Sequence, residues 1–483
     1  MNHNVVRRIL GLILMIYSLT LLPPIAVSLF YADGHSLAFL NSLFVVLSAG
    51  FVLWWPARSE TRDMRLREGF MVVSLFWVML SIAGASPLLI TDRPDLSFTD
   101  AVFESVSGFT TTGATIITGL DGLPRSVLWY RQQIQWLGGG GIIVLAIALL
   151  PVLGVGGMQL YKAEAPGAVK DQKLAPRITQ TAKLLWLVYS ALTVACAFAY
   201  WGVGMSPFDA MAHAFSTLST GGFSTYDASL GHFHSPNIEW VAILFMFLGG
   251  VNFTLHFVAF RNLSPRHYWT DPEFRGYLAV LTLMVAFITV YLWTAGVYTA
   301  PGATFRHAAF AWVSMQTSTG FLSEHFSLWP GPLPPLLLLA TFIGGCAGSS
   351  AGGMKVIRWQ LVAREGQAEM RRLVHPRAEV LIKYAGRLVS PRVLSAVGGF
   401  FAIYLLLFGV LMLLLMMTGL DQVSAWSAVA TTLNNSGPGL GSVSMNFQAL
   451  SDAGKWISVV AMLLGRLEVF TLLVIFTPAF WRS

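Results

Sequence analysis

Charged residues are scarce in this chain of 483 residues: Asp, Glu, Lys and Arg make up 11% of it, whereas hydrophobic residues make up 55% and aromatic residues 13%. A soluble chain of this length would form two or three domains, and each domain would need a polar surface. The chain lacks the polar groups for such surfaces. The shortage of charge therefore excludes a soluble protein and indicates an integral membrane protein.

Cysteine is nearly absent as well. Cys196 and Cys346 are the two cysteines of the sequence, and both have apolar or small neighbours with no partner pattern. This excludes a disulfide framework and a cysteine-based zinc site. The short alternating strands of an outer-membrane barrel are also missing, which excludes that class of membrane protein.

Long hydrophobic runs are what the sequence has instead. Each covers about 20 residues or more, the length that a helix needs to cross roughly 30 Å of hydrocarbon. Seven are uninterrupted, and three contain glycine clusters or a charge: 8–31, 37–56, 69–91, 182–203, 237–260, 276–298 and 393–418, and then 128–153, 333–357 and 455–478. The sequence thus predicts an all-α polytopic membrane protein with ten transmembrane helices. No clean cleavage site follows the first run, so we expect it to stay as an uncleaved helix.

The net charge of +7 separates into two opposed surfaces when it is sorted by loop. If every second loop is cytoplasmic, 24 of the 30 Lys and Arg residues lie inside, and the net charges are +14 inside and −7 outside. This satisfies the positive-inside rule with both the N- and C-termini in the cytoplasm. The charge is therefore no sign of a nucleic-acid partner, and the acidic outer face would concentrate cations.

Four outer segments of the chain align with one another without gaps. Each ends in a glycine preceded by small polar residues: DAVFESVSGFTTTG (100–113), DAMAHAFSTLSTGG (209–222), HAAFAWVSMQTSTG (307–320) and SAWSAVATTLNNSG (424–437). Each follows a hydrophobic run, begins with an amphipathic stretch of about ten residues, and precedes another hydrophobic run. Ten helical residues cover only about 15 Å, so such a stretch can enter the membrane but must return. We expect four re-entrant half-helices, with Asp100, Asp209 and Ser424 as N-caps and His307 as a poorer one.

The four polar turns indicate a path for cations. Irregular backbone is tolerated at membrane depth where it lines a water-filled cavity, and glycine lets neighbouring carbonyl groups turn inward together. The turns themselves contain no acidic side chain, so selection would depend on carbonyl dipoles, which favours potassium over calcium. The alternative is that the small residues serve helix packing. Four copies at matching offsets favour the ion filter.

The fourth copy departs from the others in the run that follows its turn. A glycine pair stands there in three copies, at 138–139, 249–250 and 344–345, but the fourth copy reads Gly465 and Arg466. A charge at mid-span costs at least about 3 kcal/mol unless it faces water or a partner. We interpret Arg466 as an electrostatic barrier below the filter; the alternative is a buried salt bridge to another helix. Glu468 is two residues on and is expected to point elsewhere.

The third copy departs in a different way, because its glycine pair opens the segment GGCAGSSAGG at 344–353. Ten small residues with five glycines make a poor helix. We expect a flexible break beneath the filter that acts as a gate; the alternative is a packing face of small residues. The basic segment 355–392 follows directly, so a cytoplasmic partner bound there would pull on the break.

In combination, these motifs resemble one known family over nearly the whole chain. The turns TTTGAT (110–115), STGGFS (219–224), TSTGF (317–321) and NNSGPGLG (434–441), the break GGCAGSSAGGMK and the sequence GRLE at 465–468 are similar to those of the Trk/Ktr/HKT superfamily of potassium transporters. The two additional N-terminal helices resemble the Trk branch, with its TrkH-type subunits, more than the shorter KtrB type.

The resemblance implies a potassium uptake protein of the bacterial inner membrane, a homodimer with one pore per protomer. It further implies a cytoplasmic ring of TrkA-type regulatory subunits that bind ATP, ADP or NAD, while this chain itself holds no cofactor. By the family pattern the filter carbonyls belong to Thr111, Thr112, Gly113, Thr220, Gly221, Gly222, Ser318, Thr319, Gly320, Asn435, Ser436 and Gly437. The gate falls on Gly344, Gly345, Gly348, Gly352, Gly353 and Arg466. Serine at the first filter glycine accompanies sodium selectivity in related plant transporters, so Gly113 favours potassium.

We divide the chain accordingly into an N-terminal helix pair and four pore repeats. The helix pair covers 1–68 and lies outside the pore, and the repeats cover 69–160, 161–262, 263–375 (with the gating loop 344–353) and 376–483 (with the pore arginine).

Other classes of function are less well supported. A polytopic membrane enzyme would need clustered reactive groups, and none of His213, His232, His234 and His256 has an acid at a suggestive spacing. We therefore expect no enzyme. A proton- or sodium-coupled symporter stays open, since coupling needs a second site and Glu468 is the one mid-span carboxylate on offer. A potassium-pump subunit of related pore design is a further alternative.

Overall fold

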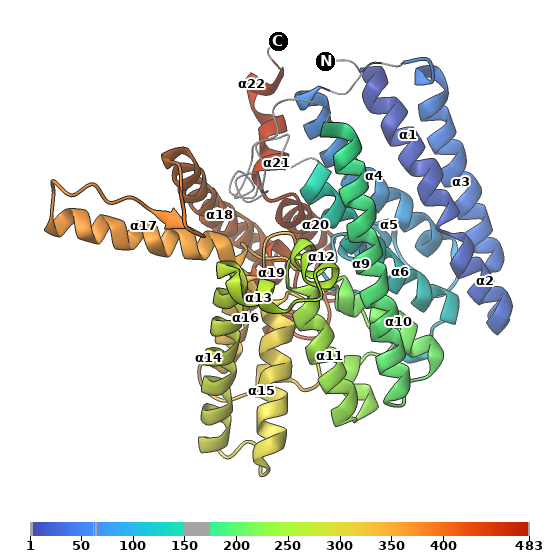
Figure 1. Ribbon diagram of the computed structural model, residues 1–483. Helices are drawn as coiled ribbons and strands as arrows, with labels where there is room; N and C mark the ends of the chain where they lie inside the picture. The colour runs from blue at the N-terminus through green and yellow to red at the C-terminus, as the bar shows by residue number, and fades with distance from the viewer. Residues whose placement is uncertain (1–2, 61, 63–64, 149–173, 482–483) are drawn as a thin grey trace.

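A computed structural model describes residues 3–60, 62, 65–148 and 174–481, and the chain is helical almost throughout (Figure 1). In these ranges the strands are confined to one small antiparallel hairpin of β1 (Lys383–Tyr384) and β2 (Arg387–Leu388). The predicted all-α class is confirmed. Both ends of the chain lie at the same end of the molecule in Figure 1.

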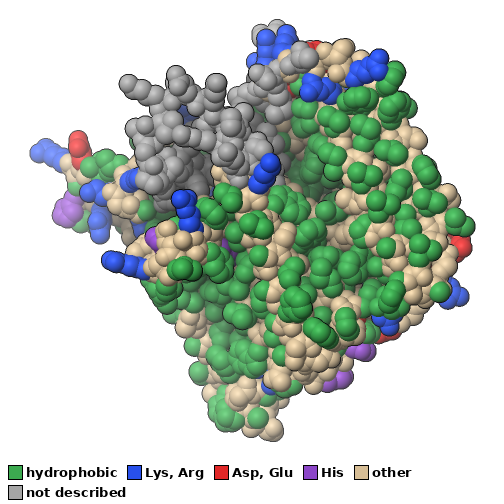
Figure 2. Space-filling model, turned by 45° about the vertical axis from the view of Figure 1, so that its right-hand side comes forward, with side chains coloured by type: hydrophobic (Ala, Val, Ile, Leu, Met, Phe, Trp, Pro, Cys, Tyr) green, Lys and Arg blue, Asp and Glu red, His purple; other side chains and the backbone are tan. Residues whose placement is uncertain are grey.

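Six helices of the described chain are long and apolar enough to cross a membrane, or seven if one bent pair counts as a single span. The first comprises α1 (His3–Leu19) with α2 (Leu22–Tyr31), and the others are α3 (Ser36–Trp54, continued by η1, Trp55–Ala57), α4 (Leu66–Ile90), α9 (Leu174–Gly202), α14 (Pro272–Thr294) and α18 (Pro391–Met417). Hydrophobic side chains cover most of the face shown in Figure 2, and Lys and Arg gather mainly toward the end where the termini lie. The protein is therefore a multi-pass membrane protein.

Four shorter helices coincide with the aligned segments: α5 (Phe98–Phe109), α10 (Pro207–Leu218), α15 (Pro301–Gln316) and α19 (Gln422–Leu433). The expected N-caps are wrong, by one helical turn in α5, α10 and α19 and by two turns in α15. The capping residues are Ser97, Ser206, Ala300 and Asp421, so that Asp100 and Asp209 lie in the first turn. Serine oxygens accept the first free N–H groups in α5 and α10, at 3.2 Å from the Asp100 nitrogen and 3.1 Å from that of Asp209.

The helices that follow the four turns differ in one respect, which is where they break. In the first, α6 (Arg125–Ala148) runs straight through its glycine pair. The other three end at the aligned pair: α11 (Pro236–Gly249) bends by 96° into α12 (Phe253–Arg261), α16 (Leu333–Ile343) gives way to a loop, and α20 (Asp452–Arg466) precedes the short α21 (Phe470–Leu473) and α22 (Pro478–Trp481). The prediction of an uninterrupted span over 237–260 is therefore wrong, because the helix ends at Gly249.

The remaining elements connect these helices. They are α13 (Arg266–Thr270), α17 (Val356–Val374) and the 3-10 turns η2 (Leu120–Gly122), η3 (Ser229–Phe233), η4 (Phe326–Leu328), η5 (Gly441–Val443) and η6 (Val474–Phe476). Helix α17 and the strand hairpin stand out from the body of the molecule in Figure 1. The end of the predicted span 128–153, the boundary at 160–161 and the start of the second predicted repeat, 161–173, lie outside the described residues.

Candidate ion pathway

The four polar turns have one backbone conformation. A non-glycine residue with positive φ opens each turn, and a glycine with positive φ follows two residues later: Thr111 (52°) and Gly113 (78°), Thr220 (52°) and Gly222 (79°), Ser318 (54°) and Gly320 (75°), Asn435 (54°) and Gly437 (83°). Left-handed backbone is uncommon for residues with a side chain. Its recurrence at the same offset shows that the aligned sequences fold alike.

Each turn is held by hydrogen bonds to the last turn of its own half-helix. The residue between the two left-handed positions donates its N–H to a carbonyl oxygen five residues earlier at 2.8 Å in all four copies: Thr112 to Ser107, Gly221 to Ser216, Thr319 to Ser314 and Ser436 to Thr431. Such bonds satisfy carbonyl groups that a helix end leaves free. They also fix the direction in which the chain leaves the half-helix.

The turns lie against one another in a closed cycle. A Cβ atom added to Gly113 would lie 2.1 Å from the carbonyl oxygen of Gly221, one on Gly222 would lie 1.9 Å from that of Thr319, and one on Gly320 would lie 2.0 Å from that of Ser436. A Cβ on Gly437 would lie 3.0 Å from the carbonyl oxygen of Thr112, which returns to the first turn. The cycle leaves no room for side chains at these glycines.

A cavity of about 190 Å³ lies beside this cycle, and all four glycines line it. Its wall also contains Arg131, Asp227 and Tyr226. The Tyr226 hydroxyl donates to Asp209 at 3.3 Å, and burial together with that carboxylate raises the pKa of Tyr226. The hydroxyl therefore stays a neutral donor at physiological pH.

The recurring glycine pairs have a packing role. A Cβ on Gly138 would lie 2.0 Å from the carbonyl oxygen of Phe109, and one on Gly465 would lie 2.1 Å from that of Leu433. Phe109 and Leu433 are the last residues of α5 and α19. In the first and fourth copies this glycine thus lets the following helix pack directly on the end of its half-helix.

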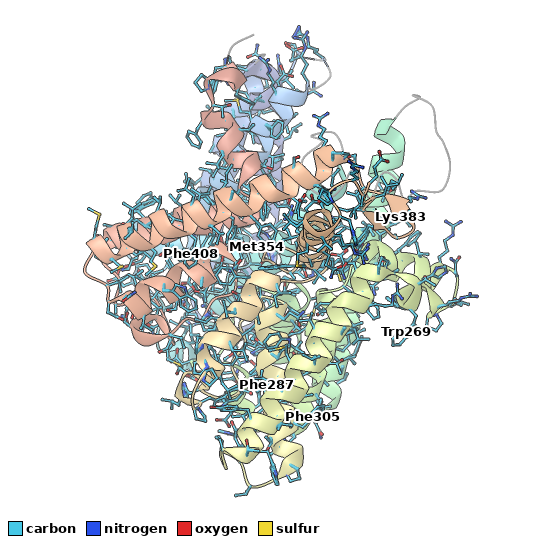
Figure 3. All side chains as sticks on the ribbon, turned by 90° about the vertical axis from the view of Figure 1, so that its left-hand side faces the viewer. Trp269, Phe287, Phe305, Met354, Lys383 and Phe408 are labelled. Carbon is cyan, nitrogen blue, oxygen red and sulfur yellow. The ribbon has the colours of Figure 1, made fainter. Side chains whose placement is uncertain are left out.

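The loop 344–353 is not helical, and it packs against three of the turns. The N–H of Gly352 donates to Ser318 Oγ at 2.5 Å, and the N–H of Gly353 donates to the carbonyl oxygen of Asn434 at 3.1 Å. Ser350 Oγ donates to the carbonyl oxygen of Leu218, the last residue of α10, at 2.9 Å. Figure 3 shows Met354, just after the loop, near the centre of the molecule.

Arg466 is 2% exposed and hydrogen-bonds to main-chain carbonyl groups. Its guanidinium donates to Ser350 O at 3.1 Å and to Gly138 O at 3.3 Å, so it connects the loop 344–353 with the glycine pair of α6. Among the described residues no ion pair involves Arg466. The described chain therefore does not show the alternative interpretation, a buried salt bridge from Arg466 to another helix. Glu468 pairs with Arg358 of α17 at 2.5 Å instead.

One carboxyl group that the sequence analysis did not single out binds both the loop 344–353 and the helix α17 that follows it. Glu273, at the start of α14, accepts the N–H of Ala347 at 2.7 Å and the N–H of Ile357 at 3.2 Å through the same oxygen. Ala347 belongs to the loop 344–353 and Ile357 to the first turn of α17. No motif near Glu273 marks this role, because its partners are about 80 residues away in the chain.

The buried residues Arg131 and Glu104 change the location of two charges that sorting by loop counts as outer charges. Arg131 and Glu104 count toward the outer face when charges are sorted by loop, but both are fully buried, in α6 and α5, and they form an ion pair of 2.7 Å. Since the two charges cancel, the outer net charge of −7 is unchanged. Arg466 and Glu468 are thus not the only ionised side chains at depth.

The structure brings the predicted site residues together. All twelve turn residues assigned to the filter lie in the closed cycle, and the predicted gate residues lie in or beside the loop that contacts it. Their roles in selecting and gating ions stay predictions.

Comparison with known proteins agrees with the resemblance seen in the motifs. Residues 35–483 match the model of the TrkH family, described as cation transport protein. The chain is 52% identical to the Trk system potassium uptake protein TrkH of Vibrio parahaemolyticus and 51% identical to that of Escherichia coli K12, with 100% of each chain covered in both alignments. It is 38% identical to TrkG of Escherichia coli K12 over 99% of each chain.

A solved structure is also similar over the full length. The crystal structure of the potassium transporter TrkH from Vibrio parahaemolyticus matches with a TM-score of 0.94 and 49% identity, covering 100% of both chains. The chain therefore belongs to the TrkH family, a family of cation transport proteins and not of enzymes.

Proposed function

We propose that this protein takes up potassium across the bacterial inner membrane through a filter of main-chain carbonyl groups. The observation that carries the proposal is the closed cycle of four turns with one backbone conformation. Carbonyl oxygens placed in this way replace the hydration shell of a cation, and the half-helices direct their partly negative ends to the same place. The relatives at 51 and 52% identity are potassium uptake proteins by name, which supports potassium as the ion.

The filter consists of the twelve turn residues Thr111, Thr112, Gly113, Thr220, Gly221, Gly222, Ser318, Thr319, Gly320, Asn435, Ser436 and Gly437. Around it stand four repeats, 69–160, 161–262, 263–375 and 376–483, with the helix pair 1–68 outside the pore. Counting the broken helices after the turns as spans gives ten, with both termini in the cytoplasm. The location of both termini at one end of the molecule supports this count.

The gate consists of the loop 344–353 together with Arg466. The loop donates hydrogen bonds to Ser318 Oγ and to the Asn434 carbonyl oxygen, and Arg466 binds the loop from the other side through Ser350 O. A positive charge beside the pathway would raise the energy of a passing cation, and the loop packs directly against the turns. Moving the loop would therefore release both obstacles together.

Control of the gate would come from the cytoplasm. Helix α17 begins directly after the loop, carries Arg358 paired with Glu468, and stands out from the body of the molecule (Figure 1). We expect a homodimer that works with a TrkA-type ring, and the ring would bind the ATP, ADP or NAD. The name Trk system in the relatives supports a multi-component assembly.

Ion flux into proteoliposomes that contain this chain alone tests the proposal. We expect potassium and rubidium to enter, and sodium to enter far more slowly. Equal sodium and potassium flux would contradict the carbonyl filter. Uptake that requires a proton or sodium gradient would favour the coupled symporter over passive flow.

A further inference from the structure

The buried ion pair of Glu104 and Arg131 is joined to the chain just beyond two of the four turns. Arg131 donates to Glu104 Oε1 through Nε at 2.9 Å and through Nη2 at 2.7 Å, and both side chains are fully buried. Glu104 accepts the hydroxyl of Thr115 at 3.0 Å and the N–H of Ile116 at 3.1 Å. Thr115 and Ile116 follow Gly113 by two and three residues. The carboxylate is thus fixed to the exit of the first turn.

Arg131 extends the connection to the second turn. Its Nη1 donates to the carbonyl oxygen of Ser224 at 3.2 Å, and its guanidinium carbon lies 4.3 Å from the centre of the Phe223 ring. Ser224 follows Gly222 by two residues, as Thr115 follows Gly113. One guanidinium therefore spans equivalent positions of neighbouring repeats.

The Glu104–Arg131 pair with its hydrogen bonds, called the brace below, is not repeated around the cycle of turns. The position of Glu104 is occupied by His213 in the second repeat, where Nε2 lies 2.9 Å from Ser224 Oγ, and by Ala311 and Ala428 in the third and fourth repeats. The chain beyond the third and fourth turns is held by neutral serine hydroxyls that donate to the carbonyl oxygens of Phe321 and Leu440. Among the described residues, an ion pair that is also bonded to the chain just beyond the turns is thus found between the first and second repeats, whereas the ion pairs Arg306–Glu239 and Lys455–Asp100 join other repeats near the starts of their helices.

The pair also keeps the charge of Arg131 from repelling cations in the cavity beside the four glycines. Arg131 lines the cavity beside the four glycines, where an uncompensated positive charge would repel cations. The Glu104 carboxylate at 2.7 Å cancels that charge without adding a mobile anion to the cavity. The hydrogen bonds to Thr115, Ile116 and Ser224 fix the geometry of the pair, and removal of either partner would leave an uncompensated buried charge.

We propose that the Glu104–Arg131 pair is a positioning element for ion selection, which sets the spacing between the first and second turns and thereby the preference for potassium over sodium. The proposal rests on the carbonyl filter proposed above. It assigns the filter a rigid side, where repeats one and two meet, while neutral hydrogen bonds hold the chain beyond the third and fourth turns.

The variants Arg131→Gln and Glu104→Gln test this role, and Lys455→Gln is the matched control. Lys455 forms an ion pair of 2.6 Å with Asp100 on the same half-helix, but neither residue contacts the chain beyond a turn in the described structure. Potassium-to-sodium uptake ratios are measured in proteoliposomes. Hydrogen exchange of peptides covering 111–118 and 220–227 is measured in parallel, because it reports the brace without any transport.

We expect each of the two pair variants to lower the uptake ratio roughly tenfold, which corresponds to about 1.4 kcal/mol of lost discrimination. Exchange should become faster in both peptides, and Lys455→Gln should change neither readout. A folded variant with an unchanged ratio would overturn the proposal even if total uptake fell. If Arg131→Gln and Glu104→Gln do not fold, Arg131→Lys and Glu104→Asp keep the charges and lose part of the geometry; a normal ratio in both would also overturn it.

The same measurements separate this proposal from the proposed function. An unmodified protein that admits sodium and potassium equally would overturn the carbonyl filter, and the selectivity role of the pair with it. A selective unmodified protein whose pair variants stay selective would overturn the positioning role alone.

Discussion

Conformation and space both demand glycine at the four ends of the turns. Gly113 has φ of 78°, and a Cβ there would lie 2.1 Å from the carbonyl oxygen of Gly221. The first requirement costs a side chain about 1–2 kcal/mol, whereas the second forces one turn away from its neighbour. Only the second requirement bears on the spacing of carbonyl groups.

Gly113→Ser is therefore expected to reduce potassium preference and not merely stability. The matched control is Gly119→Ser, since Gly119 has φ of 73° with nothing within 4 Å of an added Cβ. Both glycines have a left-handed φ of similar size, so the difference between the two variants reports mainly the contact with Gly221. We expect the potassium-to-sodium uptake ratio to fall roughly tenfold in Gly113→Ser, about 1.4 kcal/mol of discrimination, and to stay normal in Gly119→Ser. Equal ratios in the two variants would contradict this reading of the turn.

Arg466→Ala is expected to accelerate uptake. The substitution removes a buried positive charge together with its hydrogen bonds to Ser350 O and Gly138 O. We expect initial rubidium uptake to rise roughly three- to tenfold, which corresponds to a barrier lower by about 0.7–1.4 kcal/mol. Arg306→Ala serves as control. It removes an arginine of α15 that pairs with Glu239 and forms no hydrogen bond to the loop 344–353. Folded Arg466→Ala protein with unchanged or slower uptake would contradict the barrier.

The sequence predicted the residues of the turns better than their surroundings. Glycine and small polar residues at fixed offsets encode a local backbone conformation, so the turns were found from the alignment of four segments alone. The helix starts were missed by one turn, because Ser97 and Ser206 are as good as the aspartates that follow them. The partner of Arg131 was missed since ion pairs between distant segments leave no local pattern.

At the scale of elements, the helices that follow the turns decide where the pathway is obstructed. Helix α6 continues through its glycine pair, whereas α11, α16 and α20 end there. Hydropathy predicted the six spans that the structure shows, but not the bend of 96° between α11 and α12, because apolar side chains continue across the bend. Of these breaks, the sequence predicted only the one at 344–353, from its five glycines among ten small residues.

Glu273→Ala is expected to loosen the gating loop. The carboxylate accepts N–H groups from the loop and from α17, and the alanine leaves both N–H groups without that acceptor, at a cost of about 1–3 kcal/mol each. We expect a severalfold rise in basal uptake with the potassium-to-sodium ratio unchanged, measured in proteoliposomes. Glu369→Ala removes the same type of side chain from the exposed side of α17 and should have no effect. A changed ratio would place the action of Glu273 at the filter instead of the gate.

At the scale of the whole molecule, the charges and the two chain ends point to one orientation. The inner loops carry +14 and the outer loops −7, and both termini lie at the same end of the structure. Cytoplasmic placement of that end satisfies the positive-inside rule. It would also place α17 and its hairpin in the cytoplasm, within reach of the regulatory ring proposed above, and the cavity beside the four glycines toward the outside.

This orientation can be tested with single cysteines, because the native Cys196 and Cys346 are both buried and free. Asp121→Cys and Ala378→Cys introduce thiols at exposed positions, one between the first turn and α6 and the other between α17 and the strand hairpin. We expect a membrane-impermeant maleimide to label Asp121→Cys in intact cells, and to label Ala378→Cys only after the membrane is permeabilised. The unmodified protein should stay unlabelled in both cases. The reverse pattern would turn the molecule over, place the loop 344–353 on the outer side of the filter, and remove the cytoplasmic route of control.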